Sequence, residues 1–205
     1  MFTKQYRWRT FVLIMVNFFR EFTGIKFFNF FGVKIFEEVN GNGNLLNFLG
    51  VCAELVSIVP SYLLGDRMGR KWTLQMSTII MTSMCFVMAS FVYSDWNVIL
   101  WLPYMIYINC FGWGLGGTVF TYYAEVLPPS GCMFGSSLNW VFAAAVGKGG
   151  PLLSDAIGAG SVMLFFGICC FCGLMFMWAY CRETKDKTPE EIEEAFNRKQ
   201  CYFWK

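Results

Sequence analysis

Six long apolar segments, separated by short polar connections, limit what this chain of 205 residues can fold into. They cover residues 10–36, 45–64, 72–93, 98–122, 133–153 and 161–180. Crossing about 30 Å of hydrocarbon as a helix takes about 20 apolar residues, and each segment is of that order of length. Lipid cannot satisfy exposed backbone groups, so spanning segments are expected to be helices. The sequence therefore predicts an all-α membrane protein with six transmembrane helices.

The charged residues agree with this prediction. They make up only 15% of the chain, whereas soluble domains carry about a quarter. The bases before the first segment, after the second and after the sixth are Lys4, Arg7, Arg9, Arg67, Arg70, Lys71, Arg182, Lys185 and Lys187. The opposite connections carry Glu37, Glu38, Asp95 and Asp155. Because basic loops stay inside, both termini are expected on the cytoplasmic side, or the matrix side in a mitochondrion.

The chain divides into three regions by composition. A basic segment covers residues 1–9, the membrane domain covers 10–180, and a polar tail covers 181–205. In the tail, Thr188 can cap a helix whose first residue is Pro189, with Glu191 as the reciprocal capping partner. The tail is therefore predicted to form a short amphipathic helix that ends near Asn197.

Two glycine-rich stretches lie within the predicted spans. Residues 112–117 read Gly-Trp-Gly-Leu-Gly-Gly, which fits either close helix packing or a functional hinge. Residues 149–151 read Gly-Gly-Pro, and we expect them to break the end of the fifth span. Lys148, just before this break, is interpreted as a base that reaches toward the membrane surface.

Neither a metal site nor an enzyme is indicated. Cys169, Cys170 and Cys172 are clustered, but no histidine or nearby carboxylate completes a metal site. There is no nucleotide loop, nucleophile motif or carboxylate pair, so we expect no catalysis, no cofactor and no nucleic-acid partner. The first apolar segment continues past Arg20 and Glu21, which is unlike a cleavable signal peptide.

Four motifs occur in one order along nearly the whole chain. They are Phe22-Thr23-Gly24-Ile25-Lys26 followed by Ile35-Phe36; Gly65-Asp66-Arg67-Met68-Gly69-Arg70-Lys71; Ala124-Glu125-x-x-Pro128 with Asn139-Trp140; and Glu183-Thr184-Lys185 with Thr188-x-Glu190-Glu191-Ile192. With these motifs the chain resembles the C-terminal half of a sugar porter of the major facilitator superfamily. The resemblance implies spans seven to twelve of a transporter that holds its substrate between two six-span halves. Since Met1 stands just before the first segment, we expect the N-terminal half to be absent.

The chain departs from the family pattern where the family contacts sugar. The resemblance places the former sugar site at positions now charged or apolar: Arg20, Glu21, Lys26, Phe30, Phe31, Glu54, Gly112 and Phe120. Of the family's contacts, Asn139 and Trp140 remain. Charges inside a membrane are costly, so they pair or serve a function. We hypothesise that Glu54 pairs with Arg20 or Lys26 and fills the former sugar site. The alternative is a site for a charged solute or a proton.

The charges expected on the cytoplasmic face keep the family pattern. The resemblance implies that Arg67, Arg70, Glu125 and Glu183 form the family's cytoplasmic ion-pair network. An arginine that the family has after A-E-x-x-P is missing, and Cys132 stands near its place. The framework is therefore mostly kept while the substrate contacts are largely replaced.

This combination favours a non-transporting accessory subunit, a porter half within a larger membrane complex. Its expected partners are the lipid bilayer and other membrane subunits, and a small-molecule substrate is not favoured. A respiratory assembly of the mitochondrial inner membrane is one example of such a host. The basic start of the chain, with no acid before Glu21, permits mitochondrial import but does not argue for it. The alternative is a half-size transporter for sugar or another small solute, working as a dimer or with a partner half. Residues 112–117, Asn139 and Trp140 support that alternative.

Overall fold

The computed structural model describes residues 6–40, 43–94, 96 and 99–197. The helices are α1 (Arg7–Glu21), α2 (Ile25–Asn40), α3 (Gly43–Val56), α4 (Ile58–Met68), α5 (Arg70–Tyr93), α6 (Trp101–Phe111), the π-helical turn η2 (Gly112–Gly116), α7 (Thr118–Val126), α8 (Pro129–Ile157), α9 (Ala159–Tyr180) and α10 (Pro189–Asn197). The described residues contain no strand, as predicted for an all-α protein. Some predictions fall outside the described part: residues 1–5 and 198–205, Asp95, and the side chains of Glu37, Glu38 and Asp66.

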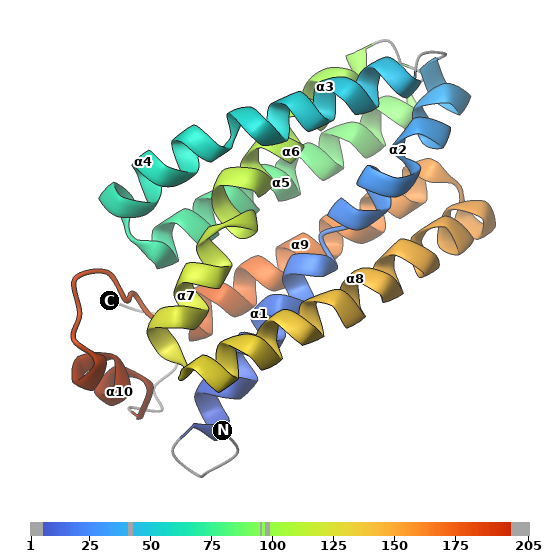
Figure 1. Cartoon of the computed structure of the whole chain (residues 1–205). Helices are drawn as coiled ribbons and strands as arrows, with labels where there is room; N and C mark the ends of the chain where they lie inside the picture. The colour runs from blue at the N-terminus through green and yellow to red at the C-terminus, as the bar shows by residue number, and fades with distance from the viewer. Residues whose placement is uncertain (1–5, 41–42, 95, 97–98, 198–205) are drawn as a thin grey trace.

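The long helices run side by side in a bundle, with α5 and α9 behind α3, α4, α7 and α8 (Figure 1). The most extensive packing joins α5 to α9 and then α5 to α6, while α1 packs on α8 and α9. Helix α2 closes the bundle by contacting α3 and α8. This arrangement brings the end of α1, the start of α2, η2 and the middle of α8 together.

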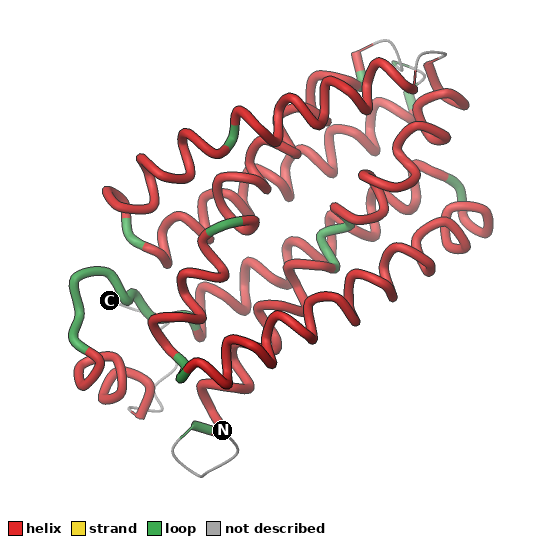
Figure 2. The backbone as a smooth tube through the Cα atoms, in the orientation of Figure 1, coloured by secondary structure: helices red, strands yellow, loops and turns green. Residues whose placement is uncertain are grey.

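The apolar segment 10–36 folds as two helices rather than one. Helix α1 ends at Glu21 and α2 begins at Ile25, with a short turn between them (Figure 2). Gly24 has φ +89°, a conformation that residues with a Cβ rarely adopt. A Cβ at Gly24 would also lie 2.6 Å from the ring of Phe166. The break is therefore fixed both by the backbone and by the packing of α9.

Within the described residues, three helical stretches are long and apolar enough to cross a membrane: Gly43–Ser61, Arg70–Tyr93 and Ala159–Tyr180. The predicted spans 10–36 and 98–122 are each shared between shorter helices, α1 with α2 and α6 with α7. Helix α8 is long enough at 29 residues, but glycine and serine interrupt its apolar residues. The number of six spans therefore stays a prediction.

The predicted break at residues 149–151 is wrong, because α8 continues through Pro151 to Ile157. Proline lacks a backbone N–H and its ring crowds the carbonyl four residues earlier. Here that earlier residue is Gly147, which is buried beside the ring of Phe30. Neighbouring helices can hold such a proline inside a membrane helix.

The short helix predicted in the tail is confirmed. Helix α10 runs from Pro189 to Asn197, and the Thr188 N–H donates to Glu191 Oε2 at 2.9 Å. In return the Glu191 N–H donates to Thr188 Oγ1 at 3.3 Å, which completes the capping box. Ile192 and Phe196 lie four residues apart and are both buried, and α10 packs against α7. The amphipathic pattern thus fixes α10 to the end of the bundle.

Candidate functional site

A buried arginine joins α1, η2 and α8 by hydrogen bonds inside the bundle. Arg20, at the end of α1, donates from Nε to the carbonyl of Leu115 at 2.9 Å. Its Nη1 donates both to Glu21 Oε1 and to Asn139 Oδ1 on α8. The side chains of Arg20, Glu21 and Asn139 are almost completely buried. We call Arg20, Glu21, Asn139, Phe111 and Phe120 the Arg20 cluster.

Two aromatic rings complete the Arg20 cluster. The guanidinium carbon of Arg20 lies 4.9 Å from the ring centre of Phe120 and 5.3 Å from that of Phe111. The two rings come from α7 and α6, on either side of η2. An aromatic face attracts a cation, most strongly where water is excluded. Phe120, which the resemblance assigned to the former sugar site, therefore contacts the arginine with a ring that is itself 40% exposed.

The Arg20 cluster is electrically balanced but not fully hydrogen-bonded. Glu21 is 0% exposed and neutralises Arg20 with one carboxylate oxygen. Its other oxygen, Oε2, is buried without a hydrogen-bond partner among the described residues. A buried ion pair gains little net stability, but the loss of one partner is costly because the other charge is then uncompensated. The two charges consequently depend on each other.

The hypothesis that Glu54 pairs with Arg20 or Lys26 is wrong. Arg20 is paired with Glu21, and in the described part of the chain no ion pair joins Glu54 to either base. Glu54 lies half-buried on α3, near enough to Tyr104 of α6 to interact electrostatically with it. The α1–α2 break and the Leu115 carbonyl of η2, which accepts from Arg20, decide this outcome, and neither is visible in the sequence.

Lys26 occupies a more open position than Arg20. Its Nζ lies 5.7 Å from the ring centre of Trp140 on α8, and the lysine is half-buried. Trp140 and Phe30 are each 68% exposed. Phe31, the next position of the former sugar site, is half-buried and stacks with Phe27 at 6.4 Å between ring centres. Lys26, Trp140 and Phe30 therefore lie at the open side of α2 and α8, beside the buried Arg20 cluster.

The glycines of η2 pack against serines of neighbouring helices. A Cβ at Gly112 would lie 1.8 Å from Ser57 Oγ, and one at Gly114 would lie 2.0 Å from both Cβ and Oγ of Ser77. The missing side chains thus let α3, α4 and α5 approach η2 closely, which supports the packing interpretation. The π-helical turn is an irregularity of a kind frequent at functional sites. Here its Leu115 carbonyl serves Arg20.

A second polar cluster lies at the end of the bundle near α10. Arg70 Nε donates to Glu125 Oε1 at 2.9 Å, and Thr184 Oγ1 donates to Glu125 Oε2 at 2.5 Å. Glu183 accepts from the backbone N–H groups of Arg70 at 2.8 Å and Lys71 at 3.1 Å. We call Arg70, Glu125, Glu183 and Thr184 the α5-end network. It ties α5 and α7 to the segment before α10.

Arg67, the fourth residue predicted for this network, makes a different contact in the structure. The carbonyl of Arg67 accepts a hydrogen bond from Lys185 Nζ at 2.9 Å, while the Arg67 residue itself is exposed.

Near the same end of the bundle, burial raises the pKa of the Cys181 thiol to about 12, so this thiol is neutral at physiological pH. Among the described residues no group of three or more metal-ligating side chains forms.

Replacing Glu183 with alanine is expected to lower the free energy of unfolding by about 1–2 kcal/mol. Helix α5 has no side-chain cap from its own N-cap residue, Gly69, and Glu183 accepts from its first N–H groups instead. Thermal unfolding in detergent measures the change. Glu190→Ala, in an exposed acid of α10, is the control and should change stability by under about 0.5 kcal/mol. Equal effects of the two variants would contradict the capping role.

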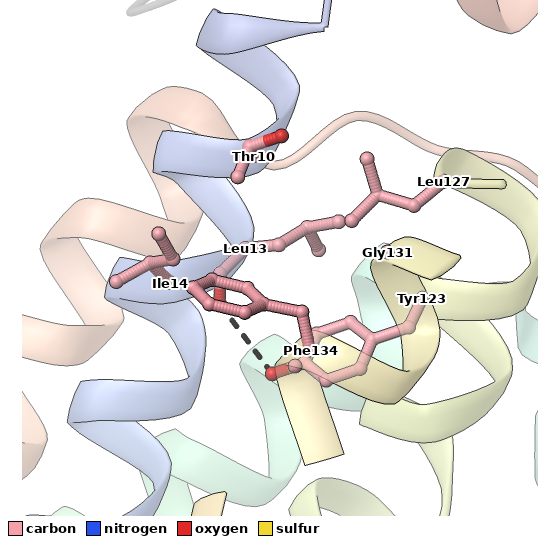
Figure 3. A pocket seen from close by; sticks show the side chains of 8 residues that line it. Thr10, Leu13, Ile14, Tyr123, Leu127, Gly131 and Phe134 are labelled. Atoms are coloured by element: carbon pink, nitrogen blue, oxygen red, sulfur yellow. Dashed lines mark hydrogen bonds between the residues drawn. The ribbon is translucent and has the colours of Figure 1, made fainter. Parts of the chain in front are cut away.

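A small apolar pocket between α1, α7 and α8 is separate from the Arg20 cluster (Figure 3). Thr10, Leu13, Ile14, Tyr123, Leu127, Gly131, Phe134 and Gly135 line it. The Tyr123 hydroxyl donates to the Leu13 carbonyl at 3.4 Å across it, the bond that Figure 3 draws as a dashed line. The pocket offers no charge for chemistry, so the Arg20 cluster and Lys26 remain the candidate site.

Two parts of this site, the Leu115 carbonyl and Phe111, are not predicted by the sequence. The glycine-rich run around Leu115 was the available signal, because glycine often marks irregular backbone whose carbonyls are free to accept. Phe111 carried no signal, since an aromatic residue in an apolar helix is most often packing. Which side of the membrane each cluster faces stays a prediction.

Comparison with known proteins gives consistent results. The family model described as "Sugar (and other) transporter" matches residues 1–196. Trehalose transporter 1 of Drosophila melanogaster and the facilitated trehalose transporter Tret1-1 of Drosophila sechellia are each 33% identical to this chain over 190 residues. Those matches cover 86% of this chain, and the chain spans only 22% of the length of either relative.

The fold is also similar to that of a solved transporter structure. The proton:xylose symporter XylE, bound to 6-bromo-6-deoxy-D-glucose, superposes with a TM-score of 0.81 at 19% sequence identity. The superposition covers 91% of this chain and 42% of the symporter. A double tryptophan mutant of XylE gives a TM-score of 0.75 with the same coverage. The chain thus has the fold of part of a major facilitator protein.

Proposed function

Because this chain belongs to the sugar (and other) transporter family, we propose that it forms one half of such a porter and serves as a non-transporting subunit of a larger membrane assembly. In this proposal residues 10–180 form the membrane domain and correspond to the second half of a complete transporter. The C-terminal residues 181–205 form a tail, in which Glu183 and Thr184 belong to the α5-end network. Its relatives carry transporter names, and transport is not an enzymatic reaction.

One observation supports the non-transporting role above the others. The guanidinium of Arg20 is held inside the protein by Glu21, Asn139 and the Leu115 carbonyl, at positions where the family presents neutral amides to sugar. A sugar could take these contacts only by separating a buried ion pair, at a cost of about 3–5 kcal/mol. Asn139, a retained family contact, accepts from Arg20 and so is less available to a hydroxyl group.

A half-size transporter is the second candidate, and a different observation favours it. The membrane helices are interrupted at Gly24, at Ser57 and at η2, and discontinuous helices line the substrate sites of many transporters. Such a half would need a second copy or a partner half to enclose a pathway. The names of its relatives indicate trehalose as the first solute to test.

Purified protein in liposomes is expected to take up neither trehalose nor xylose above the level of protein-free liposomes. A complete trehalose transporter in matched liposomes is the positive control. In its host membrane the chain, of 23.6 kDa, is expected to migrate on native gels in an assembly much larger than twice its own mass. Membrane fractionation identifies the host. Saturable uptake by the wild-type chain would overturn this proposal in favour of the second candidate.

A further inference from the structure

Lys26 adds a positive charge that the Arg20 cluster does not balance. Arg20 and Glu21 neutralise each other, so the three charged residues near the α1–α2 break carry a net charge of +1. Glu21 also attracts Lys26, but it is 0% exposed and its ion pair is with Arg20. Over the described parts of the chain, no carboxylate forms an ion pair with Lys26. Its one described contact is the ring of Trp140.

The position of Lys26 along the predicted first span places it far from both membrane surfaces. Lys26 is sixteen residues from one end of the segment 10–36 and ten from the other. The ten residues belong to α2 and correspond to about 15 Å at about 1.5 Å per helical residue, and the sixteen residues cover most of α1 and the break before α2. The four-carbon stem of a lysine cannot span such a distance. A lipid phosphate group is therefore out of reach as a partner.

The surroundings of Lys26 are aromatic and uncovered. Trp140, which Lys26 contacts, and Phe30, one helical turn after Lys26 on α2, are each 68% exposed, and Val141 next to Trp140 is 61% exposed. They lie on α8 and α2, which run side by side at one edge of the bundle (Figure 1). An unpaired cation within an apolar surface at mid-depth is rare, because such charges pair with groups of neighbouring helices. The surface is thus suited to a helix that brings a negative charge.

We propose that Lys26, Trp140 and Phe30 bind a transmembrane helix of a different polypeptide, which carries an Asp or Glu at the depth of Lys26. The carboxylate pairs with the Lys26 ammonium, and the two aromatic side chains pack against the apolar flank of the partner helix. This inference rests on the proposed function as a subunit of a larger assembly, and it names the chemistry of the contact.

A second copy of this chain fits the surface less well. In a twofold dimer the same surface meets itself, which brings Lys26 close to the partner's Lys26. Like charges across an interface suppress association. Glu54, an acid within the predicted membrane domain, lies on α3 rather than on α2 or α8. A cross-link between Lys26 and Glu54 would therefore mark a homodimer.

Carbodiimide cross-linking in the host membranes, followed by mass spectrometry, tests the proposal directly. This reagent joins a lysine to a carboxylate without a spacer, so it reports only ion pairs. The expected product links Lys26 to an Asp or Glu within an apolar segment of a different protein. A link from Lys26 to Glu54 of a second copy, or no product at Lys26 while the large assembly persists, would overturn the proposal.

Charge variants supply a second readout. Lys26→Gln is expected to reduce the fraction of the chain in the large assembly by roughly 30-fold or more, whereas Lys26→Arg retains it. The isolated Lys26→Gln chain should unfold at an unchanged or higher temperature, since it loses an uncompensated charge. Lys26→Glu with a lysine at the mapped partner carboxylate should restore assembly. Lys148→Gln, at an exposed base of α8, is the matched control and leaves assembly unchanged.

These outcomes separate the two proposals. If the wild-type chain forms no large assembly and takes up sugar, the proposed function fails. If the assembly forms but is equally abundant with Lys26→Gln, only the contact proposed for Lys26 fails.

Discussion

Replacing Arg20 with leucine is expected to lower the free energy of unfolding by about 3–5 kcal/mol. The substitution leaves Glu21 as an uncompensated charge at a position that is 0% exposed. It also removes the donors to the Leu115 carbonyl and to Asn139 Oδ1. Scanning fluorimetry in detergent, with unfolding followed by tryptophan emission, measures the loss. A loss of this size indicates that Arg20 stabilises the fold, whereas a side chain that only faces a substrate path would cause a much smaller loss.

Two further variants make this result specific to the ion pair. Arg20→Gln together with Glu21→Gln removes both charges and restores the amides that the sugar porter pattern has there. This double variant is expected to regain most of the stability lost by Arg20→Leu, because neither partner remains as an isolated charge. Arg7→Leu, at an exposed position of α1, should have little effect. If the double variant were as unstable as Arg20→Leu, the interdependence of the two charges would be refuted.

A methyl group added at Gly114 is expected to destabilise the fold by about 1–3 kcal/mol through overpacking. In Gly114→Ala the new Cβ would lie 2.0 Å from Cβ and Oγ of Ser77, so rotation of the serine hydroxyl does not relieve the clash. The π-helical turn or α5 must then move, which also displaces the Leu115 carbonyl that accepts from Arg20. Thermal unfolding of the purified variant is the measurement.

The same substitution elsewhere in the bundle provides the control. A Cβ at Gly149 on α8 would meet no described atom within 4 Å, so Gly149→Ala should be neutral or stabilising by up to about 1 kcal/mol. Ser77→Gly combined with Gly114→Ala removes the atoms that clash and should recover the loss. Destabilisation by Gly149→Ala as large as that by Gly114→Ala would show that close packing at η2 is not the cause.

Which motif residues meet at the end of α5 was predictable from the sequence. The resemblance to the sugar porter family placed Arg70, Glu125 and Glu183 together, and they do lie in one network. Their individual contacts were not predictable. Glu183 accepts from backbone N–H groups of α5 rather than from a basic side chain, because the turn at Gly69, with φ +88°, brings the start of α5 against the carboxylate. Arg67 likewise takes part through its backbone carbonyl, which accepts a hydrogen bond from Lys185 Nζ.

The charged residues of the former sugar site show where prediction from the sequence stopped. The expectation that intramembrane charges pair held for Arg20, but Glu54 was the wrong partner. Side chains one residue apart on a continuous helix point in different directions, so the sequence gives no reason to pair Glu21 with Arg20. Here α1 ends at Glu21, and the Arg20 guanidinium also has Asn139 and Leu115 to bind.

The sequence by itself determined that this chain is helical and built for a membrane, since long apolar segments leave backbone groups no other way to bond. It also determined the family, because each motif is a short local pattern and the four motifs occur in a fixed order, and it determined the capping of α10, which depends on residues three apart in the chain. The tertiary structure alone decided how the buried charges are satisfied. Arg20 binds Leu115 and Asn139, which lie 95 and 119 residues away in the sequence. Such contacts depend on the π-helical turn and on the packing of α1 against α8, and neither is encoded in a local pattern.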